Sequence, residues 1–209
     1  GLVVGSWDDL DASGGGKVVG YVLELEPVKI LASPLAQTVN SGASTTLTVS
    51  ASGATPMTYQ WRRNGVAIPG ATGASYGING ADTGTVGSYD VVVGNACGTV
   101  ASASAYLEVN LPPTILAQPV GAQINPGAQL VLSVVATGSG TLEYQWRHDN
   151  AFIGGATGPS LVLNAAQLGD GGVYDVRVKN MVTEVWSVPA MVGFNVPVGI
   201  TEQPVGGAI

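Results

Sequence analysis

Lysine and arginine are scarce in this chain of 209 residues. Together they number 7, against 14 aspartates and glutamates, and the formal net charge is -7. A nucleic-acid-binding protein or a polybasic membrane contact needs clustered cations. The few cations here are scattered along the sequence. The chain is therefore expected to bind no nucleic acid and to make no electrostatic contact with a membrane.

Cysteine and histidine each occur once, as Cys97 and His148. One cysteine forms no disulfide within the chain. A zinc site of cysteine and histidine ligands needs more such residues, and nucleophilic catalysis needs a histidine held by a third group. The acids are spread out rather than paired as in a glycosidase. We expect no catalytic residues, no enzymatic activity and no organic cofactor.

Long apolar runs are also missing. No stretch of 18 apolar residues occurs, so the sequence predicts no membrane insertion. What is abundant is glycine, with 31 residues, while charged residues make up only 10%. Apolar and polar residues alternate in short segments such as 45–51, and glycine and asparagine punctuate them. This pattern of period two is typical of half-buried strands and predicts an all-β protein.

The sequence repeats itself with a constant offset of 85 positions. Tyr-Gln-Trp-Arg at 59–62 recurs at 144–147, Gly-Ala-Thr-Gly at 70–73 recurs at 155–158, and Tyr-Asp-Val at 89–91 recurs at 174–176. Two copies align without a gap, and residues 200–209 open a third. Short strands in a repeat of this size favour a β-sandwich.

Each copy resembles a bacterial immunoglobulin-like domain of the intermediate-set type. The resemblance is carried by a strand-C tryptophan, a tyrosine 28 residues later and an asparagine on the following hairpin: Trp61, Tyr89 and Asn95, then Trp146, Tyr174 and Asn180. In that family the tryptophan packs at the centre of the sandwich and the tyrosine forms a corner with the backbone. The resemblance implies two tandem immunoglobulin-like β-sandwiches.

Valine pairs stand where that family has its inter-sheet disulfide. The resemblance places Val49 with Val91 and Val134 with Val176. Packing of branched side chains replaces the bridge, without its chain-entropy contribution of about 3–4 kcal/mol. The expected structural core is Trp61, Tyr89, Val49 and Val91 in the first copy, and Trp146, Tyr174, Val134 and Val176 in the second.

The two ends differ from the repeat. Residues 1–27 resemble the last two strands of a C-type lectin-like domain, in which a Trp-Asn-Asp element supplies calcium and sugar ligands. Here the element reads Trp7-Asp8-Asp9, which makes Asp8 and Asp9 candidate calcium ligands, with a solvated turn as the alternative. The expected segments are a partial lectin-like tail at 1–27, immunoglobulin-like domains at 28–110 and 111–196, and the first strand of a third repeat, without a sandwich to join in this chain, at 197–209.

Three further residues have a functional and a structural interpretation. His148 corresponds to Arg63 in the first copy, which favours a surface position over acid–base chemistry. Cys97 corresponds to Val182, which favours a partly buried apolar position on a hairpin over a reactive thiol. Trp186 corresponds to Ala101. We favour local packing for Trp186, with an interface or a sugar contact as alternatives.

The resemblance implies a non-enzymatic segment of an extracellular or cell-surface protein of bacterial origin, whose domains act as stiff spacers and interaction surfaces. Two prolines, Pro112 and Pro113, stiffen the linker between them. Two alternatives stay open. One is a fibre or filament subunit joined through its end strands. The other is a calcium-dependent glycan-binding protein that acts through the lectin-like part. The expected partners are other protein chains, including copies of this one, and glycans under the second alternative.

Overall fold

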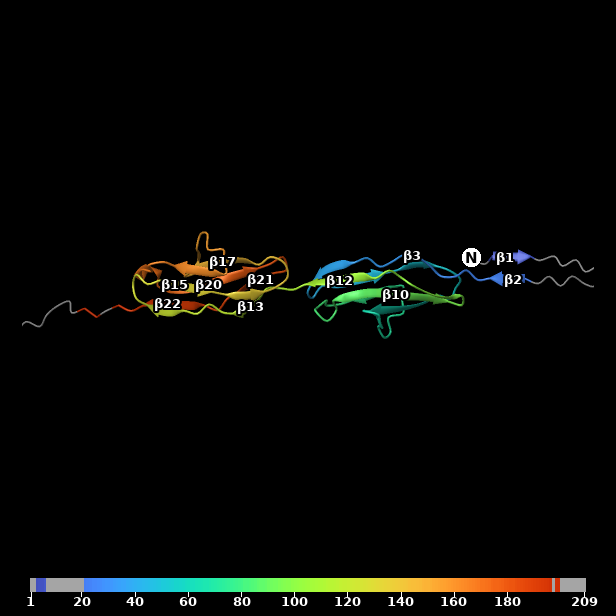
Figure 1. The fold of residues 1–209 in the computed structure, drawn as a ribbon, viewed down its shortest axis with the longest axis horizontal. Helices are drawn as coiled ribbons and strands as arrows, with labels where there is room; N and C mark the ends of the chain where they lie inside the picture. The colour runs from blue at the N-terminus through green and yellow to red at the C-terminus, as the bar shows by residue number, and fades with distance from the viewer. Residues whose placement is uncertain (1–2, 7–20, 197, 200–209) are drawn as a thin grey trace, which may run out of the picture. The chain divides into compact units, whose positions relative to one another are not determined.

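A computed structural model describes residues 3–6, 21–196 and 198–199. The chain divides into two compact units, Gly1–Asn110 and Leu111–Ile209 (Figure 1). Among the described residues all regular structure is β-strand, apart from a three-residue 3-10 helix, η1 (Leu168–Asp170). No helix in this part of the chain is both long and apolar enough to cross a bilayer. The predicted all-β fold is confirmed.

Unit 1 is built from two layers of strands. One layer is a sheet in the order β4 (Gln37–Asn40), β12 (Ala105–Asn110), β10 (Gly87–Asn95), β7 (Thr58–Arg63) and β8 (Val66–Ala67), with β11 (Gly98–Ala101) also paired to β10. The other layer contains the pairs β3 (Lys29–Ala32) with β6 (Ser50–Ser52), and β5 (Thr45–Thr48) with β9 (Ser75–Ile78). Before these, β1 (Val3–Ser6) pairs antiparallel with β2 (Tyr21–Glu24).

Unit 2 repeats the two layers of unit 1 strand for strand. Its larger sheet has the order β14 (Ala122–Ile124), β22 (Ala190–Phe194), β20 (Gly172–Lys179), β17 (Glu143–His148) and β18 (Ala151–Phe152), with β21 (Glu184–Trp186) paired to β20. Its other layer contains β13 (Thr114–Ala117) with β16 (Val135–Thr137), and β15 (Leu130–Ser133) with β19 (Ser160–Leu163).

In each large sheet, the strand that comes first in the chain pairs in parallel with the strand that comes last in the chain. In unit 1, β4 pairs with β12 from Gln37↔Leu107 to Asn40↔Asn110, and in unit 2, β14 pairs with β22 from Ala122↔Val192 to Ile124↔Phe194. We call these parallel pairings the terminal ladders. Because the paired strands point the same way, the chain enters each unit at one pole and leaves it at the opposite pole.

The core of each unit lies between its layers and follows from the alternation in the sequence. The expected core residues are all buried: Val49, Trp61, Tyr89 and Val91 in unit 1, and Val134, Trp146, Tyr174 and Val176 in unit 2. Both tryptophans are fully inaccessible, and each indole Nε1 donates to a backbone oxygen, Trp61 to Gly73 at 2.9 Å and Trp146 to Gly158 at 3.0 Å. Burying an indole requires such a partner for its N–H.

The tyrosine corners use backbone acceptors. The Tyr89 hydroxyl donates to the carbonyl of Thr85 at 2.6 Å, and the Tyr174 hydroxyl donates to the carbonyl of Asp170 at 2.8 Å. The bond therefore survives the exchange of aspartate for threonine between the copies. Burial raises the pKa of both phenols. Arg63 opposes that rise at Tyr89, whereas the charges of Asp170 and Asp149 add to it at Tyr174.

Candidate interaction surface

The described residues contain no group of three or more histidine, cysteine, aspartate or glutamate side chains able to hold a metal ion. The candidate calcium ligands Asp8 and Asp9 lie outside the described residues, as do Trp7 and residues 200–209. The calcium site of the lectin-like interpretation thus remains a prediction.

His148 packs against Tyr174 and the backbone beside it. Its ring stacks on Tyr174 with centroids 4.5 Å apart, and its Nε2 lies 3.1 Å from the Gly171 carbonyl and 3.4 Å from an Asp149 carboxylate oxygen. In unit 1 Arg63 donates to the Gly84 carbonyl. Both side chains thus contact the backbone of the loop that precedes the long central strand. This shared contact accounts for the position without acid–base chemistry.

The expectation for Cys97 is wrong in one respect: the residue is exposed rather than partly buried. Asn95 occupies the inside of this turn. Its Nδ2 donates to the carbonyls of Glu26 and Ala54, and its Oδ1 accepts from the Cys97 amide at 2.9 Å. The Cys97 side chain lies outside this network, with its Sγ 3.2 Å from the Leu25 carbonyl.

A hollow of about 530 Å³ opens on one side of unit 1, between β8 and the tyrosine corner. Tyr76, Ile78 and Pro69 give it largely apolar walls. Arg63 and Tyr89 also line it, but their polar groups already donate to backbone carbonyls. No carboxylate or imidazole is among the residues that line this hollow.

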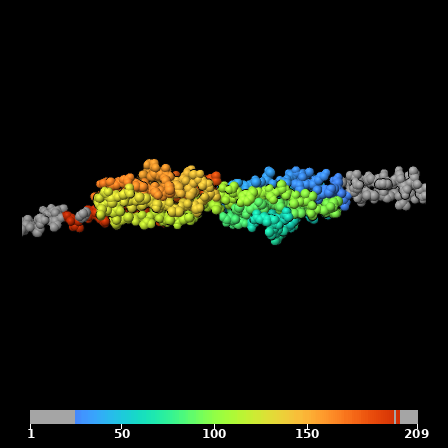
Figure 2. Space-filling view, viewed as in Figure 1, coloured from blue at the N-terminus to red at the C-terminus, as the bar shows by residue number. Residues whose placement is uncertain are grey.

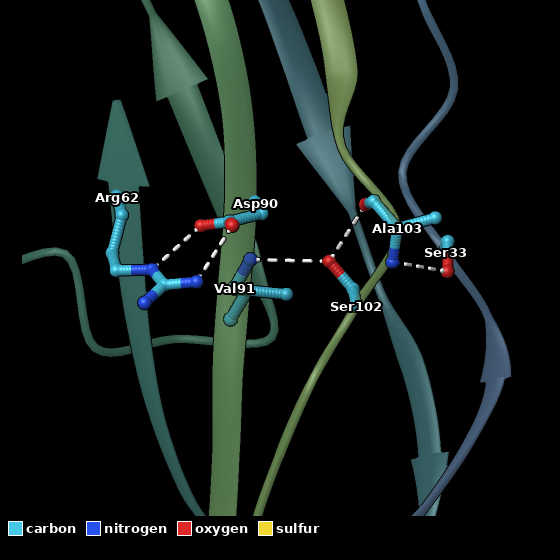
Figure 3. Close-up of polar contacts among 6 residues, drawn as sticks. All are labelled: Ser33, Arg62, Asp90, Val91, Ser102 and Ala103. Atoms are coloured by element: carbon cyan, nitrogen blue, oxygen red, sulfur yellow. Dashed lines mark hydrogen bonds and ion pairs between the residues drawn. The ribbon is translucent and has the colours of Figure 1, made fainter. Parts of the chain in front are cut away.

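Both units carry the same ion pair on the outer face of the large sheet. Arg62 holds Asp90 with two hydrogen bonds of 2.8 and 2.7 Å (Figure 3). Arg147 holds Asp175 with two of 2.8 and 2.6 Å. In each pair the hydrogen bond to the carboxylate raises the pKa of the arginine. The geometry is bidentate, which fixes both side chains across neighbouring strands.

A serine next to this pair connects the backbone of neighbouring segments. In unit 1 the Val91 amide donates to Ser102 Oγ at 3.1 Å, and that hydroxyl donates to the Ala103 carbonyl at 2.9 Å (Figure 3). In unit 2 the Val176 amide donates to Ser187 Oγ at 3.0 Å. None of the buried side-chain nitrogen or oxygen atoms among the described residues lacks a partner. The face of each unit that Figure 2 shows is closely packed.

The outer face of unit 2 has an additional cluster of side chains. The Arg147 guanidinium lies 3.6 Å from the centroid of the Trp186 ring, the Phe152 and Trp186 centroids are 6.3 Å apart, and the Arg177 guanidinium lies 5.7 Å from the Phe152 centroid. Trp186 belongs to β21, which among the described strands pairs with β20 alone. Its indole therefore crosses β20 to reach Arg147 on β17. We call Arg147, Phe152, Arg177 and Trp186 the aromatic–arginine face.

The equivalent positions in unit 1 hold small or aliphatic side chains, namely Ala67, Val92 and Ala101, beside Arg62. Trp186 is already distinctive in the sequence because it has no aromatic counterpart. Its packing on Arg147 agrees with the local packing favoured from the sequence. The sequence pattern alone does not identify Phe152 and Arg177 as candidate residues. A comparison of the outward positions of the two copies, once their register is known, identifies them.

No protein-family model matches the chain. It is 28% identical over 152 residues to Hemicentin-1 of Homo sapiens, which is 66% of this chain but 3% of that protein. Among solved structures it is similar to the titin fragment I67-I69 (TM-score 0.65, 18% identity, 80% of this chain and 65% of that fragment) and to DIP-gamma IG1+IG2 (0.69, 15%, 81% and 98%). A third is the complex of Dpr11 IG1 with DIP-gamma (0.60, 16%, 81% and 99%). The fold is a tandem of immunoglobulin-like β-sandwiches.

Proposed function

We propose that this chain is a non-enzymatic structural and adhesive segment of an extracellular or cell-surface protein. Its immunoglobulin-like domains, at 28–110 and 111–196, act as spacers and offer their outer faces to other protein chains. One of the similar solved structures is a complex, Dpr11 IG1 bound to DIP-gamma IG+IG2, which supports contact between such domains as a mode of action. The bacterial origin, the lectin-like tail, the filament alternative and the glycan alternative remain predictions from the sequence.

The observation that carries the proposal is the parallel terminal ladder of each unit. The chain enters and leaves a unit at opposite poles, so tension on the chain pulls the two ladder strands in opposite directions along their length. All the ladder hydrogen bonds are then stretched together instead of opening one at a time. A unit of this kind holds its length until the whole ladder breaks, which is what a spacer under tension requires.

Side chains reinforce both ladders. In unit 1 the Thr38 hydroxyl donates to Glu108 at 3.3 Å, and the Asn110 amide donates to Asn40 at 3.3 Å. In unit 2 the corresponding asparagine pair, Asn195 to Asn125, is joined at 3.1 Å. The register covers four residue pairs in unit 1 and three in unit 2. We therefore expect unit 1 to resist the larger force.

Single-molecule pulling on the intact chain from its two ends tests the proposal. The expected trace has two separate unfolding steps. Each step releases roughly 250 Å of chain, because about 80 residues extend by up to 3.3–3.6 Å each, less the folded length of the unit. The weaker step should belong to unit 2. A trace that lengthens smoothly, with no resolved step, would contradict a spacer role.

A matched pair of variants assigns the steps. Trp146→Ala removes a side chain from the core of unit 2 and should abolish or weaken the weaker step alone. Trp61→Ala makes the same change in unit 1 and should affect the stronger step alone. If either variant changed both steps equally, the units would not be separate spacers.

A further inference from the structure

The positive charge of unit 2 is confined to one face. In the described part of this unit, 111–196 and 198–199, the lysines and arginines are Arg147, Arg177 and Lys179. Arg147 is on β17 and the other two are on β20, at positions that alternate with the buried Trp146, Val176 and Val178. All three therefore point to the outer side of the large sheet.

Three acids balance these cations on the same face. Glu143 pairs across the sheet with Lys179, which in turn pairs with Glu184. Asp175 holds Arg147, and Glu184 lies 3.6 Å from Arg177. The other acids in the described part of unit 2, Asp149 and Asp170, lie in the turn after β17 and in η1. The outer face of the large sheet is thus charge-balanced with interleaved signs, while the other two carboxylates in the described part of the unit, Asp149 and Asp170, lie away from it.

The aromatic side chains come from the two outermost strands of this face and lean toward each other over it, with ring centroids 6.3 Å apart. Phe152 stands opposite Arg147 and Trp186 stands opposite Arg177 in the strand register. Phe152 is 59% exposed, which is a large exposed area for a phenyl ring in a soluble protein. Tryptophan, phenylalanine and arginine are enriched at the centres of protein interfaces, whereas rim positions are polar.

We infer that the aromatic–arginine face of unit 2 binds the same face of a second copy of this chain. A two-fold contact between identical surfaces needs a self-complementary patch. A patch with both signs interleaved allows each cation of one copy to meet an acid of the other, and a patch of one sign would repel its copy. The inference rests on the proposed function and names its partner.

The dimer is expected to be weak. The four strands of the face, β18, β17, β20 and β21, span about 14 Å at about 4.8 Å per spacing, and eight residues of β20 extend about 26 Å. That footprint is smaller than the roughly 800 Å² per partner of a stable complex. Association should therefore depend on concentration, and it should strengthen when several copies are held together on one surface.

Sedimentation velocity on the intact chain tests the inference, at concentrations from about 1 μM to about 1 mM, the range in which weak complexes form. The unmodified chain should shift from monomer to dimer. Trp186→Ala and, separately, Phe152→Ala should each weaken the dimer at least about tenfold, as expected for residues at the centre of an interface. Because the Phe152 ring is largely exposed, Phe152→Ala should leave the fold intact. A weaker dimer in this variant therefore reports the loss of a contact and not the loss of structure.

Val131→Ala is the matched control. Val131 is 51% exposed on β15, in the opposite layer of the same unit, so its truncation should leave the dimer unchanged. A chain that stays monomeric throughout overturns the inference. So does a dimer that persists in Trp186→Ala and Phe152→Ala, or one that Val131→Ala weakens to the same degree. Two steps in the pulling trace of a chain that never dimerises would refute the partner and leave the spacer role standing.

Discussion

At three equivalent outward positions the two units differ sharply. Unit 1 has Ala67, Val92 and Ala101, where unit 2 has Phe152, Arg177 and Trp186. Their interiors are alike, because each has a buried tryptophan bonded to a glycine carbonyl and a tyrosine corner, and both outer faces carry the same bidentate arginine–aspartate pair. The comparison teaches that residues pointing inward determine the same sandwich in both units. Residues pointing outward, such as these three, are free to differ and to give each copy a separate role.

The largest expected effect tests the shared interior. Trp61→Ala and Trp146→Ala should each cost about 3–5 kcal/mol of unfolding free energy, since a fully buried indole leaves a cavity. Hydrogen exchange on the intact chain should show lost protection only in the unit that carries the substitution. Protection lost in both units would mean that the interiors are not independent.

The next effect separates the two terminal ladders. A Cβ at Gly121 would collide with the backbone of Met191 on β22, whereas unit 1 already has alanine at the equivalent Ala36. Gly121→Ala should cost unit 2 about 1–3 kcal/mol, as overpacking does, and it should lower the force of the unit 2 step.

Ala36→Gly is the reciprocal variant. It should cost unit 1 no more than about 1 kcal/mol, the usual penalty of added backbone freedom. Equal effects of the two substitutions on thermal unfolding would show that unit 2 has no closer approach between its terminal strands.

The predictions from sequence succeed where one side chain has only one available environment. The repeat and the shared position of the two tryptophans follow from alternation and offset, whereas the valine pairs follow from the resemblance to immunoglobulin-like domains. Cys97 and Phe152 depend on the path of a turn and on the strand register. These long-range features are not encoded by the local pattern, so the exposure of Cys97 and the contact of Phe152 with Trp186 emerge only from the structure.

A smaller difference concerns the asparagine on each hairpin. Asn180 is 5% exposed and donates to the carbonyls of Leu111 and Ser139, whereas Asn95 is more exposed. Asn180→Ala removes the side-chain donor of both carbonyls from a nearly buried position and should cost about 1–3 kcal/mol. Asn95→Ala should cost less, because water can replace the amide. Chemical denaturation of both variants ranks them, and the reverse order would show that exposure does not set the cost.

The smallest effect is expected at alkaline pH. Burial raises the pKa of Tyr89 and Tyr174 above the ordinary value of about 10. The folded state therefore keeps these protons longer than the unfolded state, so this stability is complete below about pH 10 and is lost as the pH rises through the folded pKa. Thermal unfolding followed against pH should show unit 2 losing more, because Arg63 opposes the rise in the pKa of Tyr89, whereas burial and nearby acids all raise the pKa of Tyr174. A greater loss in unit 1 would contradict that ordering.

The most direct test of the division of roles transfers the outer face of unit 2 to unit 1. The variant Ala67→Phe, Val92→Arg and Ala101→Trp, placed beside the existing Arg62–Asp90 pair, gives one chain two such faces. If these outward residues alone distinguish the two units, sedimentation of this variant should show species larger than a dimer, since each chain can now join two others. If its largest species matches that of the unmodified chain, these residues do not carry the contact and the account of the two units is wrong.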